Sequence, residues 1–118
     1  MINTYIPFLG KKEKNYLLNC INSTFVSTAG PNIQRFENLF CKIYKFKHSV
    51  AVNSGTSALH IALLSSGVCR NDLVIVPSYT FAATANAITY CGGSPWFFDC
   101  DKNLFLDLKK IEKTFKKK

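Results

Sequence analysis

Short apolar runs that alternate with helical patterns constrain the fold of this chain most. Leu73–Val76 is a continuous apolar run, and Pro95–Phe98 is a second one. Between them lies a segment rich in small residues, from about residue 81 to residue 90, which Gly92-Gly93 brings to an end. Continuous apolar strands separated by helices are typical of parallel sheets with helices on their faces. We therefore predict an α/β fold with a mainly parallel sheet flanked by helices.

The remainder of the chain extends this pattern. Apolar residues at helical spacing predict helices over residues 11–22 and 31–43, and a third helix begins at the turn Asn53–Thr56 and ends near Gly67. Residues 48–52 predict a short buried strand before that third helix. Asp107 can cap a last helix that starts at Leu108.

Chain length and cysteine spacing limit the class of protein. A chain of 118 residues can bury one modest core. No apolar run approaches the length of a membrane span, and no basic start followed by an apolar run indicates a secretory signal. The five cysteines have no CxxC spacing, which favours free thiols in a reducing cytoplasm over a metal site or a disulfide framework. We expect a cytoplasmic protein with no membrane partner and no metal.

The net charge of +8 is concentrated at one end of the sequence. Residues 109–118 hold six lysines and one glutamate, so this segment alone supplies most of the excess. The pattern is that of the solvated face of a helix. No aromatic residues are interleaved with these lysines as they are in surfaces that stack single-stranded nucleic acid. We therefore expect no nucleic-acid partner.

Three turns follow the predicted strands. Parallel sheets bind ligands at the carboxyl ends of their strands, so a ligand is expected at these turns. They are Asn53–Thr56, Pro77–Phe81 and Asp99–Asp101. In the first turn, Gly55, Thr56 and Ser57 stand at the head of a helix, where backbone N–H groups and hydroxyls suit a phosphate. The alternative is an ordinary capped turn without a ligand.

The second turn offers aromatic side chains. Tyr79 and Phe81 could stack on a flat heteroaromatic cofactor, although packing into a core is the other explanation. His60 has no partner at a ligand or catalytic spacing, so we interpret it as structural. Asp99 and Asp101 are interpreted as loop caps.

Taken together, these turns resemble the sugar aminotransferases of the DegT/DnrJ/EryC1/StrS family. The resemblance covers nearly the whole chain and is carried by the segments Ser27–Pro31 with Phe36-Glu37, Ala51–His60, Val74–Ile88, Gly93–Pro95 and Asp99.

The resemblance implies a fold, a cofactor and site residues. The fold would be part of an aspartate-aminotransferase-type large domain (fold type I of the pyridoxal-phosphate enzymes), assembled as a homodimer. Residues 1–30 would form an N-terminal helix with a substrate and dimer loop, and residues 31–118 an incomplete cofactor-binding domain. Pyridoxal 5'-phosphate would be held by Gly55, Thr56 and Ser57, with Phe81 stacked on its ring.

The resemblance also implies a reaction. An amino group, typically from glutamate, would pass to a nucleotide-linked keto sugar in surface-polysaccharide or glycan biosynthesis. The loop with Ser27, Thr28 and Gly30 matches a segment near the substrate. The motifs are closest to relatives that act on UDP-linked 4-keto-6-deoxy sugars.

One departure from the family pattern is large. The Schiff-base lysine and the aspartate that pairs with the pyridine nitrogen are expected downstream of residue 118, so no catalytic residue is assigned in this chain. We expect an N-terminal fragment that is inactive alone, completed by a homodimer partner or a complementing C-terminal chain. The alternative is a non-catalytic binding or scaffold module derived from the same fold.

Overall fold

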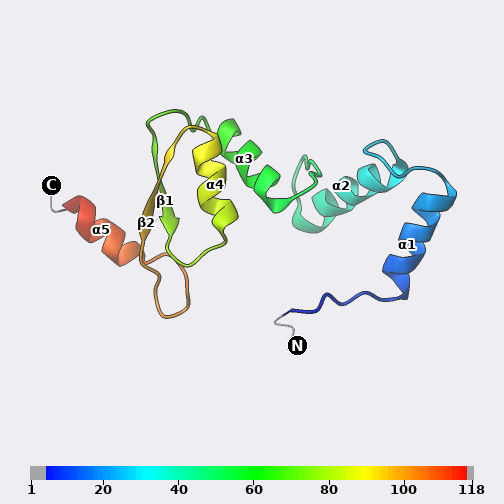
Figure 1. Ribbon diagram of the computed structural model, residues 1–118, viewed down its shortest axis with the longest axis horizontal. Helices are drawn as coiled ribbons and strands as arrows, with labels where there is room; N and C mark the ends of the chain where they lie inside the picture. Colours follow the sequence, from blue (N-terminus) through cyan, green and yellow to red (C-terminus); the bar gives the residue numbers. More distant parts are fainter. Residues whose placement is uncertain (1–4, 117–118) are drawn as a thin grey trace. The chain divides into compact units, whose positions relative to one another are not determined.

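The computed structural model describes residues 5–116, and the chain forms two compact units, Met1–Ala51 and Val52–Lys118. The first unit holds helices α1 (Lys11–Asn22) and α2 (Pro31–Tyr44). The second holds α3 (Gly55–Ser65), β1 (Leu73–Pro77), α4 (Ala82–Tyr90), β2 (Ser94–Phe98) and α5 (Leu108–Lys116), as labelled in Figure 1. This division concerns compactness, whereas the boundary expected at residue 30 concerns the roles of the segments and stays a prediction.

Strands β1 and β2 pair in parallel and confirm the predicted α/β class. Their register aligns Leu73 with Ser94 and Pro77 with Phe98. Because parallel neighbours need a crossover, α4 connects them and packs against both strands. The core lies at this contact, and its buried side chains are Val76, Ala87, Ile88 and Phe98.

Small residues let α4 approach its neighbours closely. A methyl group at Gly93, just after this helix, would meet Cγ2 of Ile88 at 3.2 Å and Cγ1 of Val68 at 3.3 Å. Glycine therefore avoids a tight contact at the point where the chain turns into β2. Helix α3 packs on α4, and the ring of His60 lies edge-on to the ring of Tyr90 at 5.7 Å. His60 thus takes part in the packing of α3 on α4, and its structural role stays a prediction.

The strand predicted over residues 48–52 is wrong. These residues form no strand, and the only sheet among the described residues is the β1–β2 pair. A strand requires a neighbouring backbone, but the amide of Ala51 instead donates to the side chain of Glu37, at 2.8 Å from Oε1. Within the described residues, the amide of Ala51 is therefore bonded to a side chain of α2 and not to a neighbouring strand.

The loop between β2 and α5 is closed by aspartates, as predicted. Asp101 Oδ1 accepts from the amides of Asn103 and Phe105, and Asp107 Oδ1 accepts from the amides of Lys109 and Lys110 at the head of α5. Asp99 forms an ion pair with Lys110, 2.7 Å from its Nζ. These acids are therefore held by turn and helix-end interactions, and no cluster of metal-binding side chains occurs in residues 5–116.

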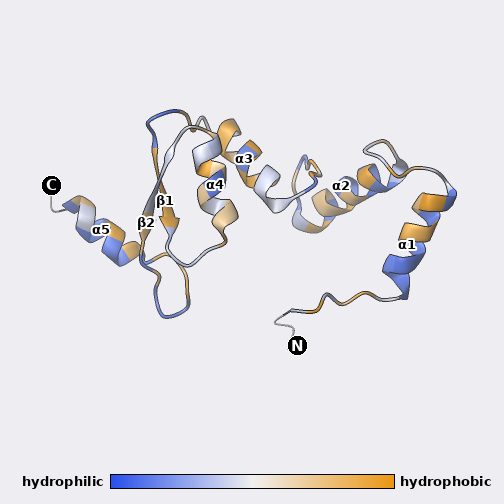
Figure 2. Cartoon of the chain, viewed as in Figure 1, coloured by the Kyte–Doolittle hydropathy of each residue, from blue (hydrophilic) through white to orange (hydrophobic). Residues whose placement is uncertain are grey.

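The first unit has no comparable core. None of its described residues is buried, and Figure 2 shows apolar segments on both α1 and α2. Helix α2 begins with Pro31 in its first turn. Its C-cap is Lys45, which adopts the left-handed conformation (φ 58°). Phe46 then stacks near Phe40 and Tyr44, with ring centroids 6.3 Å from each. The chain thereby turns back along its own helix.

Candidate functional site

The head of α3 is a capped turn with part of its backbone left free. Ser54 is the N-cap, and its hydroxyl accepts from the amide of Ser57 at 3.1 Å. Among the described residues, no acceptor is recorded for the amides of Gly55 and Thr56. The turn therefore combines a satisfied cap with two amides that can bind an anion at the positive end of the helix dipole.

Ser57 forms hydrogen bonds within the turn through both its amide and its hydroxyl. Its amide is taken by Ser54, and its hydroxyl donates to Asn53 Oδ1 at 2.9 Å and lies 2.9 Å from the hydroxyl of Ser54. These bonds hold the turn closed, so a phosphate contact from Ser57 would require its hydroxyl to exchange partners. Thr56, by contrast, has no recorded hydrogen bond from its hydroxyl to any described residue.

Gly55 faces open space. A Cβ built at this position would have no atom within 4 Å, and its φ lies outside the left-handed region. Nothing in the described chain therefore requires glycine here for steric reasons. A missing side chain beside two free amides is what close approach of an outside group needs.

The second turn presents an aromatic side chain to solvent. The chain leaves β1 through Ser78, whose amide donates to the carbonyl of Phe98 at 2.8 Å. Phe81 is the N-cap residue of α4 and is 87% exposed. Together with Tyr79 and Thr80 it lines a shallow depression of about 400 Å³. Among the described residues, neither aromatic ring belongs to the core.

The two turns begin neighbouring helices of the second unit. Helix α3 packs on α4, and Figure 1 shows α4 starting just after β1 ends. The first turn thus offers free amides and the second an exposed aromatic ring, at the starts of two helices that pack together.

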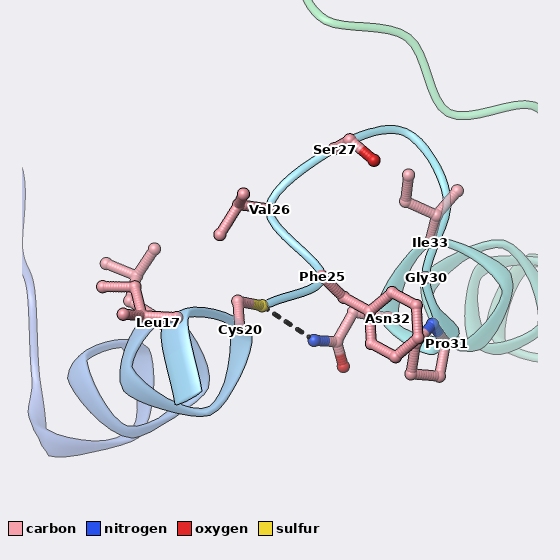
Figure 3. A pocket seen from close by; sticks show the side chains of 10 residues that line it. Leu17, Cys20, Phe25, Val26, Ser27, Gly30, Pro31, Asn32 and Ile33 are labelled. Atoms are coloured by element: carbon pink, nitrogen blue, oxygen red, sulfur yellow. Dashed lines mark hydrogen bonds between the residues drawn. The ribbon is translucent and has the colours of Figure 1, made fainter. Parts of the chain in front are cut away.

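The loop of the first unit closes on itself. Residues of α1, α2 and the connecting loop line a pocket of about 300 Å³, in which the Asn32 side chain donates to the sulfur of Cys20 at 3.0 Å (Figure 3). Gly30 packs against Phe25, because a methyl at Gly30 would meet Phe25 Cβ at 3.1 Å. The hydroxyl of Ser27 accepts from the amide of Ala29 at 3.4 Å, while Thr28 is exposed. The structure thus places Ser27 and Gly30, but not Thr28, along this pocket.

Sequence reasoning located the turn Asn53–Ser57 but did not assign the hydrogen bonds that hold it closed. Asn53 and Ser54 fix Ser57, and Ser54 could have been found from the preference for serine at N-caps. Glu37 is linked to Ala51 across 14 positions, and no local spacing signals such a contact.

Comparisons with known proteins identify the family of this chain. The sequence profile described as the DegT/DnrJ/EryC1/StrS aminotransferase family matches residues 7–118. The chain is 43% identical over 112 residues to GDP-perosamine synthase of Caulobacter vibrioides, covering 94% of this chain and 30% of that protein. It is 41% identical over 108 residues to the spore coat polysaccharide biosynthesis protein SpsC of Bacillus subtilis, covering 91% of this chain and 28% of SpsC.

Solved structures show the same relationship. DesV from S. venezuelae, in complex with a ketimine intermediate, superposes with a TM-score of 0.75 at 31% identity, over 87% of this chain and 29% of DesV. NtdA from Bacillus subtilis, with bound cofactor PMP, gives a TM-score of 0.78 at 31% identity, over 96% of this chain and 28% of NtdA. The chain thus spans under a third of the length of these relatives. It belongs to the DegT/DnrJ/EryC1/StrS aminotransferase family.

Proposed function

We propose that residues 52–116 supply part of the pyridoxal-phosphate site of an aminotransferase that acts on a nucleotide-linked keto sugar, with glutamate as the amino donor. The observation that carries this proposal is the head of α3, where free amides of Gly55 and Thr56 adjoin space that no side chain fills. Membership of an aminotransferase family and the likeness to NtdA with its bound PMP support the choice of cofactor.

The residues present fit this cofactor. A phosphate needs N–H and O–H donors without a competing carboxylate, and the turn Asn53–Ser57 has donors and no acidic residue. A planar pyridine ring needs an exposed aromatic face, which Phe81 offers at the start of the neighbouring helix α4. When bound, the cofactor supplies an electron sink for the reacting carbon.

Each group of the chain has a separate task in this proposal. The amides of Gly55 and Thr56 and the hydroxyl of Thr56 bind the phosphate, while Ser57 and Asn53 keep the turn in shape. Phe81 orients the ring by covering one of its faces. Proton transfer is assigned to a lysine, and pairing with the ring nitrogen to an aspartate, both in the part of the enzyme that lies beyond this sequence in its relatives. These residues therefore bind and orient but do not turn over substrate alone.

The sugar substrate and the assembly complete the proposal. The relatives named GDP-perosamine synthase favour a guanosine diphosphate sugar over the UDP-linked sugar that the motifs had suggested. SpsC favours a role in polysaccharide biosynthesis. We place the loop of Ser27, Thr28 and Gly30 at the sugar and at a homodimer partner or complementing C-terminal chain. No helix among the described residues has the length and apolarity to cross a bilayer.

Replacing Gly55 tests the proposal in the full-length protein that contains these residues. Gly55→Ala places a methyl in the space assigned to the phosphate, so the Kd for pyridoxal phosphate should rise about tenfold or more. Stability should hardly change, because the methyl meets no atom of the chain. Equilibrium dialysis and urea unfolding measure the two effects.

Gly67→Ala is the matched control. Gly67 has φ +85°, so alanine there should cost about 1 kcal/mol of stability and leave cofactor affinity unchanged. Unchanged affinity in Gly55→Ala would contradict the proposed phosphate site. A wild-type protein that binds no pyridoxal phosphate would support the non-catalytic module instead.

A further inference from the structure

The half-buried face of α2 contains a carboxylate with no cationic partner among residues 5–116. Its half-buried residues are Ile33, Glu37 and Cys41, spaced four apart on one side of the helix. A carboxylate in such a row costs desolvation energy unless its oxygens accept hydrogen bonds. Glu37 forms no ion pair with any described residue, so its carboxylate must accept hydrogen bonds from other groups.

Glu37 forms its hydrogen bonds with the segment that precedes the proposed phosphate turn, Asn53–Ser57. Glu37 Oε1 accepts from the amide of Ala51 at 2.8 Å, and the backbone carbonyl of Glu37 accepts from the hydroxyl of Ser49, also at 2.8 Å. The thiol of Cys41 adds a weaker contact to the Ser49 hydroxyl at 3.4 Å. One residue of α2 thus holds the returning chain at two points.

The position of the held amide gives this contact a consequence. Only Val52 separates Ala51 from Asn53. The side chain of Asn53 accepts a hydrogen bond from the hydroxyl of Ser57 in the phosphate turn. A backbone restrained at residue 51 leaves few dihedral angles free before the turn begins. Resting on the proposed function, we infer that Glu37 is a positioning residue for the phosphate turn and raises affinity for the phosphate group of the cofactor without touching it.

The chemistry of the bond specifies the variants. Gln keeps an oxygen that can accept from Ala51 but loses the charge, whereas Met has a similar length and helix propensity but no comparable acceptor. In the full-length protein, Glu37→Met should raise the Kd for pyridoxal phosphate about tenfold, and Glu37→Gln should stay within about twofold of the wild type. Glu37→Asp, which is one methylene shorter, should behave like Glu37→Met.

Pyridoxal, which lacks the phosphate, separates positioning from general structural support. The Kd for pyridoxal should be the same in the wild type, Glu37→Met and Glu37→Gln, when measured by equilibrium dialysis at equal fractions of folded protein. A purely structural role would weaken pyridoxal and pyridoxal phosphate equally, and that result would overturn the inference. So would a Glu37→Met protein that binds pyridoxal phosphate like the wild type.

The same titrations distinguish the two proposals. A wild-type protein that binds pyridoxal phosphate no better than pyridoxal would remove the phosphate site itself, and the inference with it. A wild-type preference for the phosphorylated form that Glu37→Met retains in full would leave the proposed function intact and remove only the role of Glu37. Should Glu37→Met fail to fold, the Glu37→Asp and Glu37→Gln pair decides by the same criterion.

Discussion

The two compact units of this chain are held together by different means. In Val52–Lys118, a helix and two parallel strands bury Val76, Ala87, Ile88 and Phe98 against one another. In Met1–Ala51, no described side chain is buried, and the order of the chain after α2 depends on hydrogen bonds to Glu37 and on stacked rings around Phe46. Apolar burial and specific polar contacts differ in how they respond to substitution, which makes the difference measurable.

The largest expected effect compares one substitution in the two units. Ile88 is 2% exposed and Ile43 is 61% exposed. Ile88→Ala should cost about 2–5 kcal/mol because it leaves a cavity in the core, whereas Ile43→Ala should cost less than about 1 kcal/mol. Urea unfolding of this chain measures both. Equal losses would mean that the apolar side of α2 is packed against something beyond the described residues.

The second comparison uses glycines that contact a neighbour. Gly93→Ala forces a methyl against Ile88 and Val68 in the core and should cost about 1–3 kcal/mol. Gly30→Ala meets Phe25 Cβ at 3.1 Å, but Phe25 is half-exposed and can shift, so less than about 1 kcal/mol is expected. Thermal unfolding gives the order, and a larger loss for Gly30→Ala would show that the loop of the first unit is as rigid as the core.

The third comparison concerns helix starts. Ser54→Ala removes the N-cap of α3 and should cost about 1 kcal/mol. Glu13→Ala removes the carboxylate that accepts from the amide of Gly10 at 2.8 Å, and we expect about 0.5 kcal/mol because water can replace it at this exposed site. Chemical denaturation with helix-specific detection by circular dichroism is the measurement. A Ser54→Ala protein as stable as the wild type would show that packing on α4 alone maintains α3.

The smallest effect belongs to the exposed pair Asp99–Lys110. The Lys110 ammonium lowers the pKa of Asp99, first by its hydrogen bond and then by its charge, and the same two causes raise the pKa of Lys110. The stabilisation from Asp99 is present above the usual aspartate pKa and is lost as pH falls through its lowered folded value. That from Lys110 is present below the usual lysine pKa and is lost as pH rises through its raised folded value.

NMR titration of the Asp99 carboxyl checks this pair. The midpoint should lie below the usual aspartate value and return to it in Lys110→Met. Lys116→Met is the control, since Lys116 pairs with Glu112 at 3.6 Å and should leave Asp99 unchanged. An unshifted Asp99 in the wild type would mean that solvent separates the pair.

Local pattern predicted the elements of the second unit well. The bounds expected for β1, α4 and β2 agree with the structure to within about one residue, because continuous apolar runs and the Gly92-Gly93 stop are local signals. The strand expected over residues 48–52 failed because strand formation depends on a neighbour, and here the amide of Ala51 is bonded to a side chain 14 positions away. Sequence spacing carries no information on that partner.

The turns that carry the candidate site could be predicted from local sequence, but the hydrogen bonds within them could not. Gly55 and Thr56 begin α3 and Phe81 is the N-cap residue of α4, as the predicted helix starts imply. The hydroxyl of Ser57 is engaged by Asn53 and Ser54, and this choice among several possible hydrogen bonds is made by the geometry of the folded turn.

The parallel pairing of β1 with β2 has a further consequence for handling this molecule. Within residues 5–116 each strand has a single partner, so each offers one flank of backbone donors and acceptors to whatever lies beside it. At high concentration, copies of the isolated chain should therefore aggregate by adding strands to these exposed edges. Strand addition occurs at the edges of the sheet and leaves the ends of the strands free, so the turns at these ends stay accessible in the aggregate.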